Sequence, residues 1–377
     1  MASTFPSLEE IYDDIEKFVL NNPSIAQVKS LGSSREGRAI KAVCVTDDFP
    51  VEEKEIALIV CGRHGNELGG PVVGQALLDW LASDRGSETR KKQLVIVIPA
   101  ANPDGLFREK FHAPSDSISE TEKLIIRELT DNYKPDAVVD VHSLWFSDLE
   151  TVISAHTSSY GEDDLIHRMI SSEMVERAAL EGYPFLNTDL ESIFDLLSRL
   201  GYNNFFCEPF YENFHSLVFG MEVNHFVLSP EEVGKSGALP LVSLLEVGNR
   251  PSLWEYAPGY PNRVLIGDLS ASIRATGKNA AERRESRSQI WRNRRYFTKP
   301  RRETPDRHTV KIMTEYSGKD LSCDFSLCCR IRSTPVIHEV RLNGERADRY
   351  TCRDGCSTYI FVDIPSVRGT YELSIEI

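Results

Sequence analysis

The stretch Ile56-Ala-Leu-Ile-Val-Cys-Gly-Arg-His-Gly-Asn-Glu67 decides the fold, because an apolar run leads straight into a glycine and two metal-binding residue types. A short apolar run that ends at a glycine is typical of a strand covered on both faces of a sheet. Similar runs occupy residues 40–45, 94–99, 137–141 and 241–247. We therefore expect five strands in one domain.

Helical patterns separate these runs. Apolar residues recur every three or four positions in two stretches, and a third stretch opens with Ser119 and Glu122, which fit a capping box. The apolar positions are Leu8, Ile11, Ile15 and Phe18 in the first stretch and Val73, Leu77, Trp80 and Leu81 in the second. Alternating strands and helices predict an α/β fold with a parallel or mixed sheet flanked by helices.

Composition excludes several classes of protein. The 377 residues include 57 acidic and 43 basic side chains, a net charge of −14, which disfavours a nucleic-acid partner. The apolar runs are far shorter than the roughly 18 residues of a membrane span, so we expect no membrane partner. The first ten residues lack the pattern of a secretory signal, and the eight cysteines form no paired framework. These features favour a cytoplasmic protein; they leave its oligomeric state open.

The charge pattern suggests three parts. Residues 278–307 contain eleven Lys and Arg but four Asp and Glu, so we expect a main domain at 1–270, a basic connecting segment at 271–307 and a small β-sandwich-like domain at 308–377. The basic segment is either a solvated linker, a surface that docks on an acidic domain, or a site for nucleic acid or anionic lipid. The C-terminal cysteines are either buried free thiols or, less simply, a four-thiolate zinc site.

A candidate metal site lies at the ends of two predicted strands. His64 and Glu67 follow the run 56–61, and His142 ends the run that begins at residue 137. Ligands gather at the carboxyl ends of strands in open α/β sheets. Two histidines and one glutamate leave the fourth position of a tetrahedral zinc ion open, as in catalytic sites. Asp140 either orients one of these ligands or pairs with a donor in the core.

Four blocks in the same order resemble the M14 zinc carboxypeptidases. They are Gly32-Ser-Ser-Arg-Glu-Gly-Arg38, His64 with Glu67, Asn102-Pro-Asp-Gly105, and Asp140-Val-His-Ser143. The resemblance covers roughly residues 8–260. It implies a mixed, mainly eight-stranded sheet, one zinc ion per chain bound by His64, Glu67 and His142, and hydrolysis of a peptide amide bond.

The same resemblance implies a glutamate that takes a proton from the attacking water. Glu222 and Glu246 are the two candidates. We favour Glu246, because it ends an apolar run after Pro240 and is similar to the family's block of proline, apolar strand and glutamate.

A cationic side chain is expected to stabilise the negative charge that develops on the carbonyl oxygen and to bind substrate. Arg108, after the Asn-Pro-Asp-Gly block, is our candidate, although it could equally be a surface arginine. Arg63 would point away from the site if the backbone there is extended.

One block of the family is missing. The family has an Asn-Arg pair that clamps the free carboxylate of a peptide, whereas residues 108–116 here read Arg-Glu-Lys-Phe-His-Ala-Pro-Ser-Asp. A single lysine cannot reproduce the fork of a guanidinium group. We therefore predict a zinc-dependent hydrolase of the metallocarboxypeptidase type that acts on a peptide or a peptide-like substrate. The alternatives are a deacylase of N-acyl amino acids or cell-wall fragments, and an inactive binding module.

Overall fold

The computed structural model describes residues 5–47, 53–108, 120–144, 152–155, 161–189, 206, 208–249, 265–268, 270–354 and 356–377. The chain forms two compact units. The first comprises Met1–Tyr211 and Ser216–Asn249, and the second comprises Glu212–His215 and Arg250–Ile377. No helix among these described residues is long and apolar enough to cross a membrane.

The first unit is built on one mixed sheet of eight strands in the order β1-β2-β4-β3-β5-β8-β6-β7, which confirms the predicted sheet. Strands β4, β3, β5 and β8 are parallel neighbours, and the outer strands include antiparallel pairs. The strands are β1 (Ala26–Ser33), β2 (Ala39–Val45), β3 (Glu55–Cys61), β4 (Gln93–Ile98), β5 (Ala137–Leu144), β6 (Val152–Ala155), β7 (Leu186–Asp189) and β8 (Leu217–Asn224). Every residue of β3 and β4 is buried, as their apolar sequences predict.

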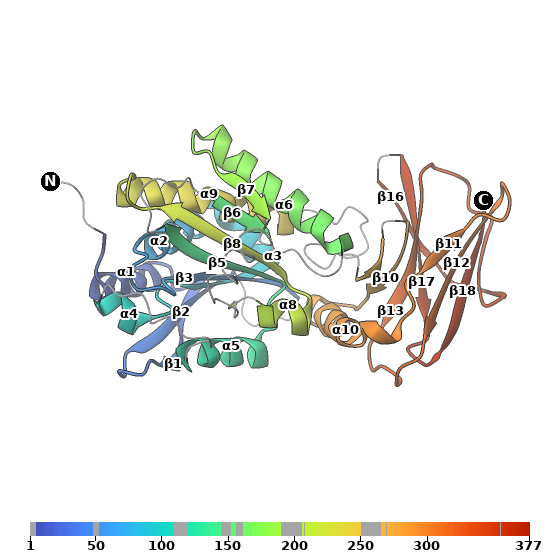
Figure 1. Cartoon of the computed structure of the whole chain (residues 1–377), viewed down its shortest axis with the longest axis horizontal. Coiled ribbons are helices and arrows are strands. Elements are labelled where there is room, and N and C mark those ends of the chain that lie inside the picture. Colours follow the sequence, from blue (N-terminus) through green and yellow to red (C-terminus); the bar gives the residue numbers. More distant parts are fainter. Residues whose placement is uncertain are drawn as a thin grey trace. The chain divides into compact units, whose positions relative to one another are not determined.

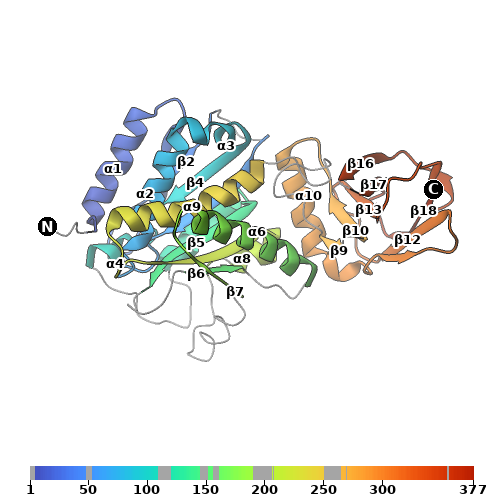
Figure 2. The same ribbon diagram turned by 90° about the horizontal axis from the view of Figure 1, so that it is seen from above.

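Helices cover both faces of this sheet (Figure 1). Helices α2, α6 and α9 lie over one face, where Figure 2 shows them crossing the strands, and α5 lies under the other. The helices are α1 (Leu8–Asn21), α2 (Gly69–Ala82), α3 (Ser87–Lys92), α4 (Pro103–Arg108), α5 (Glu120–Asn132), α6 (Gly161–Leu180), α8 (Glu208–Phe214) and α9 (Pro230–Asn249). The apolar stripe of α1 is buried, and Ser7 and Glu10 form a capping box at its start.

The strand predicted at residues 241–247 is wrong. This segment is the second half of α9, a helix of 20 residues that contains Pro240. Helix α9 packs against both α2 and α6, so it is buried on most of its sides. A helix covered in this way has a nearly continuous apolar sequence, which periodicity cannot distinguish from a buried strand.

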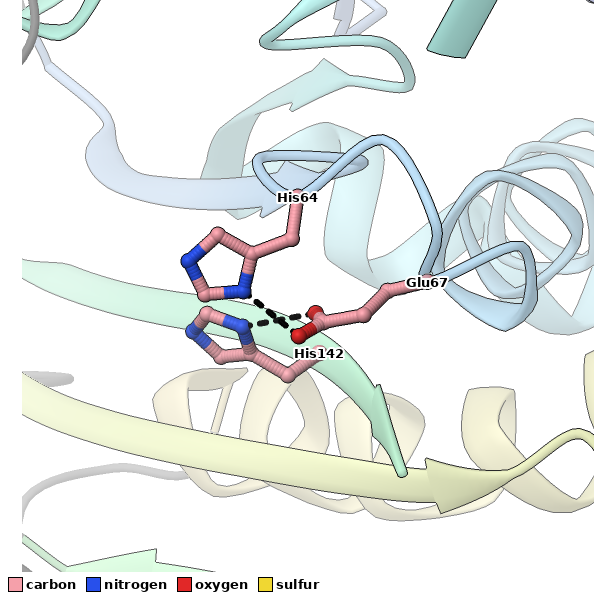
Figure 3. A group of neighbouring side chains, drawn as sticks. All are labelled: His64, Glu67 and His142. Carbon is pink, nitrogen blue, oxygen red and sulfur yellow. Dashed lines mark hydrogen bonds and ion pairs between the residues drawn. The ribbon is translucent and has the colours of Figure 1, made fainter. Parts of the chain in front are cut away.

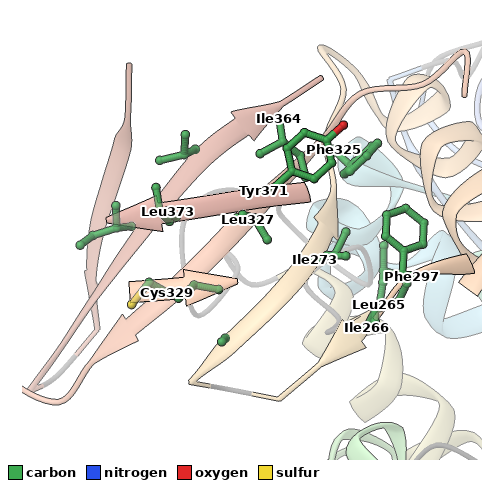
Figure 4. Packing of buried hydrophobic residues seen from close by; sticks show 14 of the residues in the cluster. Leu265, Ile266, Ile273, Phe297, Phe325, Leu327, Cys329, Ile364, Tyr371 and Leu373 are labelled. Carbon is green, nitrogen blue, oxygen red and sulfur yellow. The ribbon is translucent and has the colours of Figure 1, made fainter. Parts of the chain in front are cut away.

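In the described part of the second unit, two β-sheets form a sandwich, and helix α10 packs with them. One sheet has the order β16-β17-β13-β10-β9 and the other β11-β12-β18-β14-β15. Figure 4 shows apolar side chains of its buried core, among them Phe325, Leu327 and Leu373. The elements are β9 (Ile266–Gly267), β10 (Ala271–Ala275), α10 (Ala280–Arg292), β11 (Arg301–Glu303), β12 (Thr309–Tyr316), β13 (Phe325–Ile331), β14 (Glu339–Leu342), β15 (Glu345–Arg346), β16 (Tyr350–Asp354), β17 (Ser357–Ile364) and β18 (Gly369–Glu376).

The boundary predicted for this unit is too late in the chain. Residues 271–307 are not a linker, because β10 pairs along its whole length with β13, and Ile290 of α10 lies in the sandwich core. The linker was predicted because this segment is rich in arginine. Arg284 and Arg287 belong to α10 and are buried, although their charge suggested a solvated segment.

The metal-ligand loop of the first unit packs tightly on a second loop. A Cβ atom added to Gly65, which lies between His64 and Glu67, would fall 2.0 Å from the carbonyl carbon of Gly105. Backbone cannot move aside as a flexible side chain can. The Asn102-Pro-Asp-Gly105 block therefore acts as a support for the loop that carries two candidate ligands.

We predict that Gly65→Ala destabilises the first unit by about 2 kcal/mol or more, because the added methyl group overpacks two backbone segments. This corresponds to a fall of about 4 to 8 °C in the melting temperature of a unit of this size. Gly369→Ala is the control, since the nearest atom to its added Cβ would be 3.7 Å away. Equal melting curves for the two variants, measured by calorimetry, would contradict the close packing.

Candidate metal centre

A left-handed glycine turns the chain from β3 into the candidate site. Gly62 follows the last residue of β3 and has φ of +64°. An added Cβ would lie 2.9 Å from the carbonyl oxygen of Pro99, so both the backbone angle and the space require glycine. This turn ends the alternation of the strand and directs the following residues toward the neighbouring strand β5.

Three side chains meet at this edge of the sheet (Figure 3). The Nδ1 atom of His64 lies 2.5 Å from Oε1 of Glu67, and Nδ1 of His142 lies 2.9 Å from Oε2. One ligand atom from each of the three residues falls within 4.8 Å of the others. Among the described residues, no other group of three or more potential ligands lies this close together. The three ligands predicted from the sequence therefore do come together.

This donor set fits zinc. Zinc is bound by imidazole nitrogen and carboxylate oxygen at about 2.0 to 2.2 Å, and three protein ligands are typical of a catalytic site. Both imidazole rings turn the same atom, Nδ1, toward the Glu67 carboxylate. Glu67 is 4% exposed, and the backbone N–H of Ser143 donates to its Oε2 atom at 3.3 Å. Glu67 is thus largely shielded from water and is held by the backbone of β5.

Asp140 lies behind His142. Its Oδ2 atom is 2.9 Å from Nε2 of His142, the ring nitrogen that faces away from Glu67. The geometry matches both expectations for Asp140, since this acid lies against a candidate ligand and also pairs with a buried donor, Arg63. Arg63 lies 3.0 Å from the same oxygen and does not point away, because the left-handed Gly62 precedes it. The expectation that Arg63 points away is therefore wrong.

The close charges shift the pKa values of these groups. Burial opposes the charged form of Asp140, but Arg63 and His142 outweigh it and lower the pKa to about 2. Burial also disfavours the charged form of His142, yet Asp140 and Glu67 raise its pKa well above the usual value. For His64 burial prevails and lowers the pKa to about 4, so its ring is neutral at pH 7. A neutral imidazole is the form that binds a metal.

Glu222 lies directly beside the candidate ligands. It is paired with His142 in the parallel register of β5 and β8, so the two side chains lie on the same face of the sheet. Burial raises the pKa of Glu222 to about 8, against the opposing charge of His142 and with support from Glu67. A carboxyl group with a strongly raised pKa beside a metal-ligand cluster is a candidate for acid–base chemistry.

Glu246, the base preferred from the sequence, is not in this site. It lies near the end of α9, is partly exposed, and its carboxylate is 3.6 Å from Arg177. The side chain of Gln93, the first residue of β4, donates to the carbonyl oxygen of Leu245 at 2.7 Å. This end of α9 therefore lies at the amino ends of the parallel strands, whereas the ligands lie at the carboxyl ends, about 20 Å away along a seven-residue strand.

The sequence contained a signal for Glu222. The apolar run that begins at Leu217 ends in Glu222, just as the run that begins at Ala137 ends in His142. When two parallel strands are neighbours and each ends in a functional residue, the two residues lie at the same edge of the sheet. The prediction of Glu246 as the base relied instead on Pro240, which lies within a helix.

Arg108 is also outside the site. Its guanidinium group pairs with Glu36, and its side chain is 55% exposed. Glu36 additionally pairs with Arg38 at 2.6 Å, so Arg108 belongs to a surface cluster. Lys110 and His112, from the stretch that replaces the family's Asn-Arg pair, lie outside the described residues. Tyr211 is a buried core residue, and Nδ1 of His225 lies 2.7 Å from the hydroxyl of Ser143.

Four cysteines of the second unit match the expectation of buried thiols. They are Cys323, Cys328, Cys329 and Cys352, whereas Cys356 is exposed. Burial raises the pKa of both Cys323 and Cys329 to about 12, which keeps these thiols protonated. Their surroundings are apolar core rather than a site that would favour thiolates.

Comparisons with known proteins agree with this geometry. Residues 11–112 match the family model of zinc carboxypeptidases. Human carboxypeptidase D is 31% identical over 121 residues, which are 29% of this chain and 9% of that protein. The chain thus matches only a small part of this curated relative.

Solved structures share the fold. Bovine thrombin-activatable fibrinolysis inhibitor, in complex with tick carboxypeptidase inhibitor, has 16% identity and a TM-score of 0.51, and the match covers 64% of this chain and 96% of that one. Carboxypeptidase A from Helicoverpa armigera has 14% identity and a TM-score of 0.51, with 64% and 72% covered. Residues 11–112 therefore match the zinc carboxypeptidases in sequence, and the first unit has the fold of these proteins.

Proposed function

We propose that the first unit is a zinc-dependent hydrolase that cleaves a peptide or peptide-like amide bond. One observation carries this proposal: His64, Glu67 and His142 converge at the carboxyl ends of parallel strands, with Glu222 in register beside His142. Three ligands and an adjacent carboxylate are the components that a hydrolytic zinc site requires. The family match over residues 11–112 supports the same reaction class.

Different residues would bind the metal, transfer the proton and orient a ligand. His64, Glu67 and His142 would hold the ion, which when bound polarises a carbonyl group and makes water a nucleophile at neutral pH. In its ionised form, Glu222 accepts the proton of the attacking water at a carboxylate oxygen and then delivers it to the leaving nitrogen. Its place on a buried strand keeps this carboxylate fixed next to the ligands. Asp140 holds the ring of His142 from the other side.

The metal assignment is tested first. We expect His64→Ala and His142→Ala each to lose most bound zinc, because two protein ligands remain where three are needed. Zinc content per chain after dialysis, measured by atomic emission, checks this expectation. His308→Ala, a change in the second unit, should keep the wild-type content. Full zinc occupancy in both ligand variants would refute the site.

The base is tested by a matched pair of variants. We expect Glu222→Gln to keep its zinc but to lower kcat by a factor on the order of 10² to 10⁴, because an amide cannot accept the proton. Glu246→Gln is the control, since this residue lies at the other edge of the sheet, and its kcat should stay within about twofold of wild type. The reverse result would restore the assignment made from the sequence.

The recognition of a substrate carboxylate is the part of the proposal that departs from the family. The sequence lacks the Asn-Arg block, and Arg108 pairs with Glu36 instead of facing the candidate ligands. A clamp formed by charge-assisted hydrogen bonds contributes about 1.5 to 3 kcal/mol for each bond. Its absence favours a substrate whose C-terminus is not held by these residues.

We therefore predict that amidation of the C-terminal carboxylate of the best peptide substrate changes kcat/KM by less than about tenfold, equivalent to about 1.4 kcal/mol. The assay compares free, amidated and N-acyl substrates of the same sequence. A loss of a hundredfold or more on amidation would show that other residues hold the carboxylate. Activity on N-acyl amino acids alone would identify a deacylase.

A further inference from the structure

Arg63 occupies an unusual place for a charged residue. Its side chain is 11% exposed and lies between two carboxylates that are more deeply buried, Glu122 of α5 and Asp140 of β5. The distances are 2.5 Å from Nη1 to Glu122 and 3.0 Å from Nε to Asp140. The Nη2 atom lies 3.3 Å from Nε2 of His142. Three segments of the chain therefore meet at one guanidinium group directly behind a candidate ligand.

We propose that Arg63, anchored by Glu122, is a positioning residue of the metal centre that acts through Asp140. The inference rests on the proposed function, since it assumes that His142 binds zinc through Nδ1. Arg63 holds the Asp140 carboxylate against Nε2 of His142, and this contact fixes the ring with Nδ1 toward the metal. Neither Arg63 nor Glu122 has to touch the ion or the substrate.

Donor and acceptor chemistry explains the role. A guanidinium group has only N–H donors and cannot accept a hydrogen bond. The Oδ2 atom of Asp140 lies within 3.0 Å of both Arg63 Nε and His142 Nε2, so one carboxylate oxygen faces two donor nitrogens. When Nε2 carries the proton that faces this oxygen, Nδ1 keeps its lone pair for the metal. Asp140 therefore favours the ring tautomer that leaves Nδ1 available for zinc, and Arg63 contributes by holding Asp140 in place.

Glu122 makes the arrangement rigid. Its side chain is 5% exposed and is bonded to Arg63, although its sequence position had suggested a helix-capping role. The planar fork of arginine can engage Glu122 and Asp140 at the same time, through different nitrogens. A lysine offers a single nitrogen and cannot span both carboxylates with the same geometry.

If only charge mattered, Arg63 would weaken zinc binding, which is the opposite of the effect that we propose. A guanidinium group near a ligand repels a divalent cation, so removing it should tighten zinc binding if only charge matters. If Arg63 positions Asp140, removing it should weaken zinc binding. Changes to the groups that orient a metal-bound histidine typically cost about 10- to 100-fold in affinity.

The experiment measures zinc affinity of the full chain by competition with a chromophoric chelator. We expect Arg63→Met to lose about 10- to 100-fold in affinity. The matched control is Arg90→Met, because Arg90 is as buried as Arg63 and pairs with a carboxylate, Asp47, but precedes β4 at the amino ends of the parallel strands, away from the ligands. Its zinc affinity should stay within about threefold of wild type. A loss of less than fivefold in Arg63→Met, or tighter binding, would overturn the proposal.

A second variant covers the case in which Arg63→Met does not fold. Glu122→Gln keeps the shape of the anchor but removes its charge, and we expect it to weaken zinc binding by at least threefold. Unchanged affinity in this variant would overturn the role of the anchor. If the wild-type chain itself binds no zinc, the proposed function fails; if wild type binds zinc and both variants bind it equally well, only the present inference fails.

A double-mutant cycle tests whether Arg63 acts through Asp140. Asp140→Asn alone should weaken zinc binding about tenfold or more. Once Asp140 has been changed, we expect Arg63→Met to alter the affinity by less than about threefold further. A full additional loss in the double variant would show that Arg63 acts by another route and would overturn the proposal.

Discussion

The parallel alignment of β3, β5 and β8 is the constraint on which the rest of the first unit depends. Parallel strands in register bring their carboxyl ends to one edge of a sheet. Here that edge receives His64 just after β3, and it places His142 beside Glu222 on the neighbouring strands. This register matters because a slip by one residue would turn Glu222 to the opposite face from His142.

Burial of charge at the same edge has a cost that the arrangement must offset. Isolated carboxylates in a dry interior are strongly destabilising unless they are paired. Glu67 faces two histidines, and Asp140 faces Arg63 and His142. The site is therefore a network in which acids and bases alternate. Such a network restrains the rings of the histidines, and a bound cation would replace contacts between Glu67 and the two rings.

The sequence predicted those parts of the fold in which local pattern and burial agree. The runs at 56–61, 94–99 and 137–141 are strands, because a short apolar segment between turns has few alternatives. The three metal ligands followed from the ends of such runs. The pattern failed for α9, which is apolar because other helices surround it, and for α10, in which Arg284 and Arg287 are buried. Both failures have one cause: burial there is decided by tertiary packing.

The choice of base shows the same limit at the level of a single residue. Glu222 and Glu246 both end apolar runs, and the sequence around them does not say which run is a neighbour of β5. Only the strand order, in which β8 pairs with β5, places one glutamate beside His142. Local sequence thus identified the kinds of residue that the chemistry needs, whereas the order of strands decided which of them meet.

Three arginines of the first unit are already paired with carboxylates of the protein. Arg63 pairs with Glu122 and Asp140, Arg38 pairs with Glu36 and Asp104, and Arg108 pairs with Glu36. A guanidinium group already paired with carboxylates would have to break these contacts to bind the carboxylate of a substrate. These three arginines are therefore poor candidates for a substrate clamp. The strands supply the metal ligands and the base, so specificity must come from other residues around them.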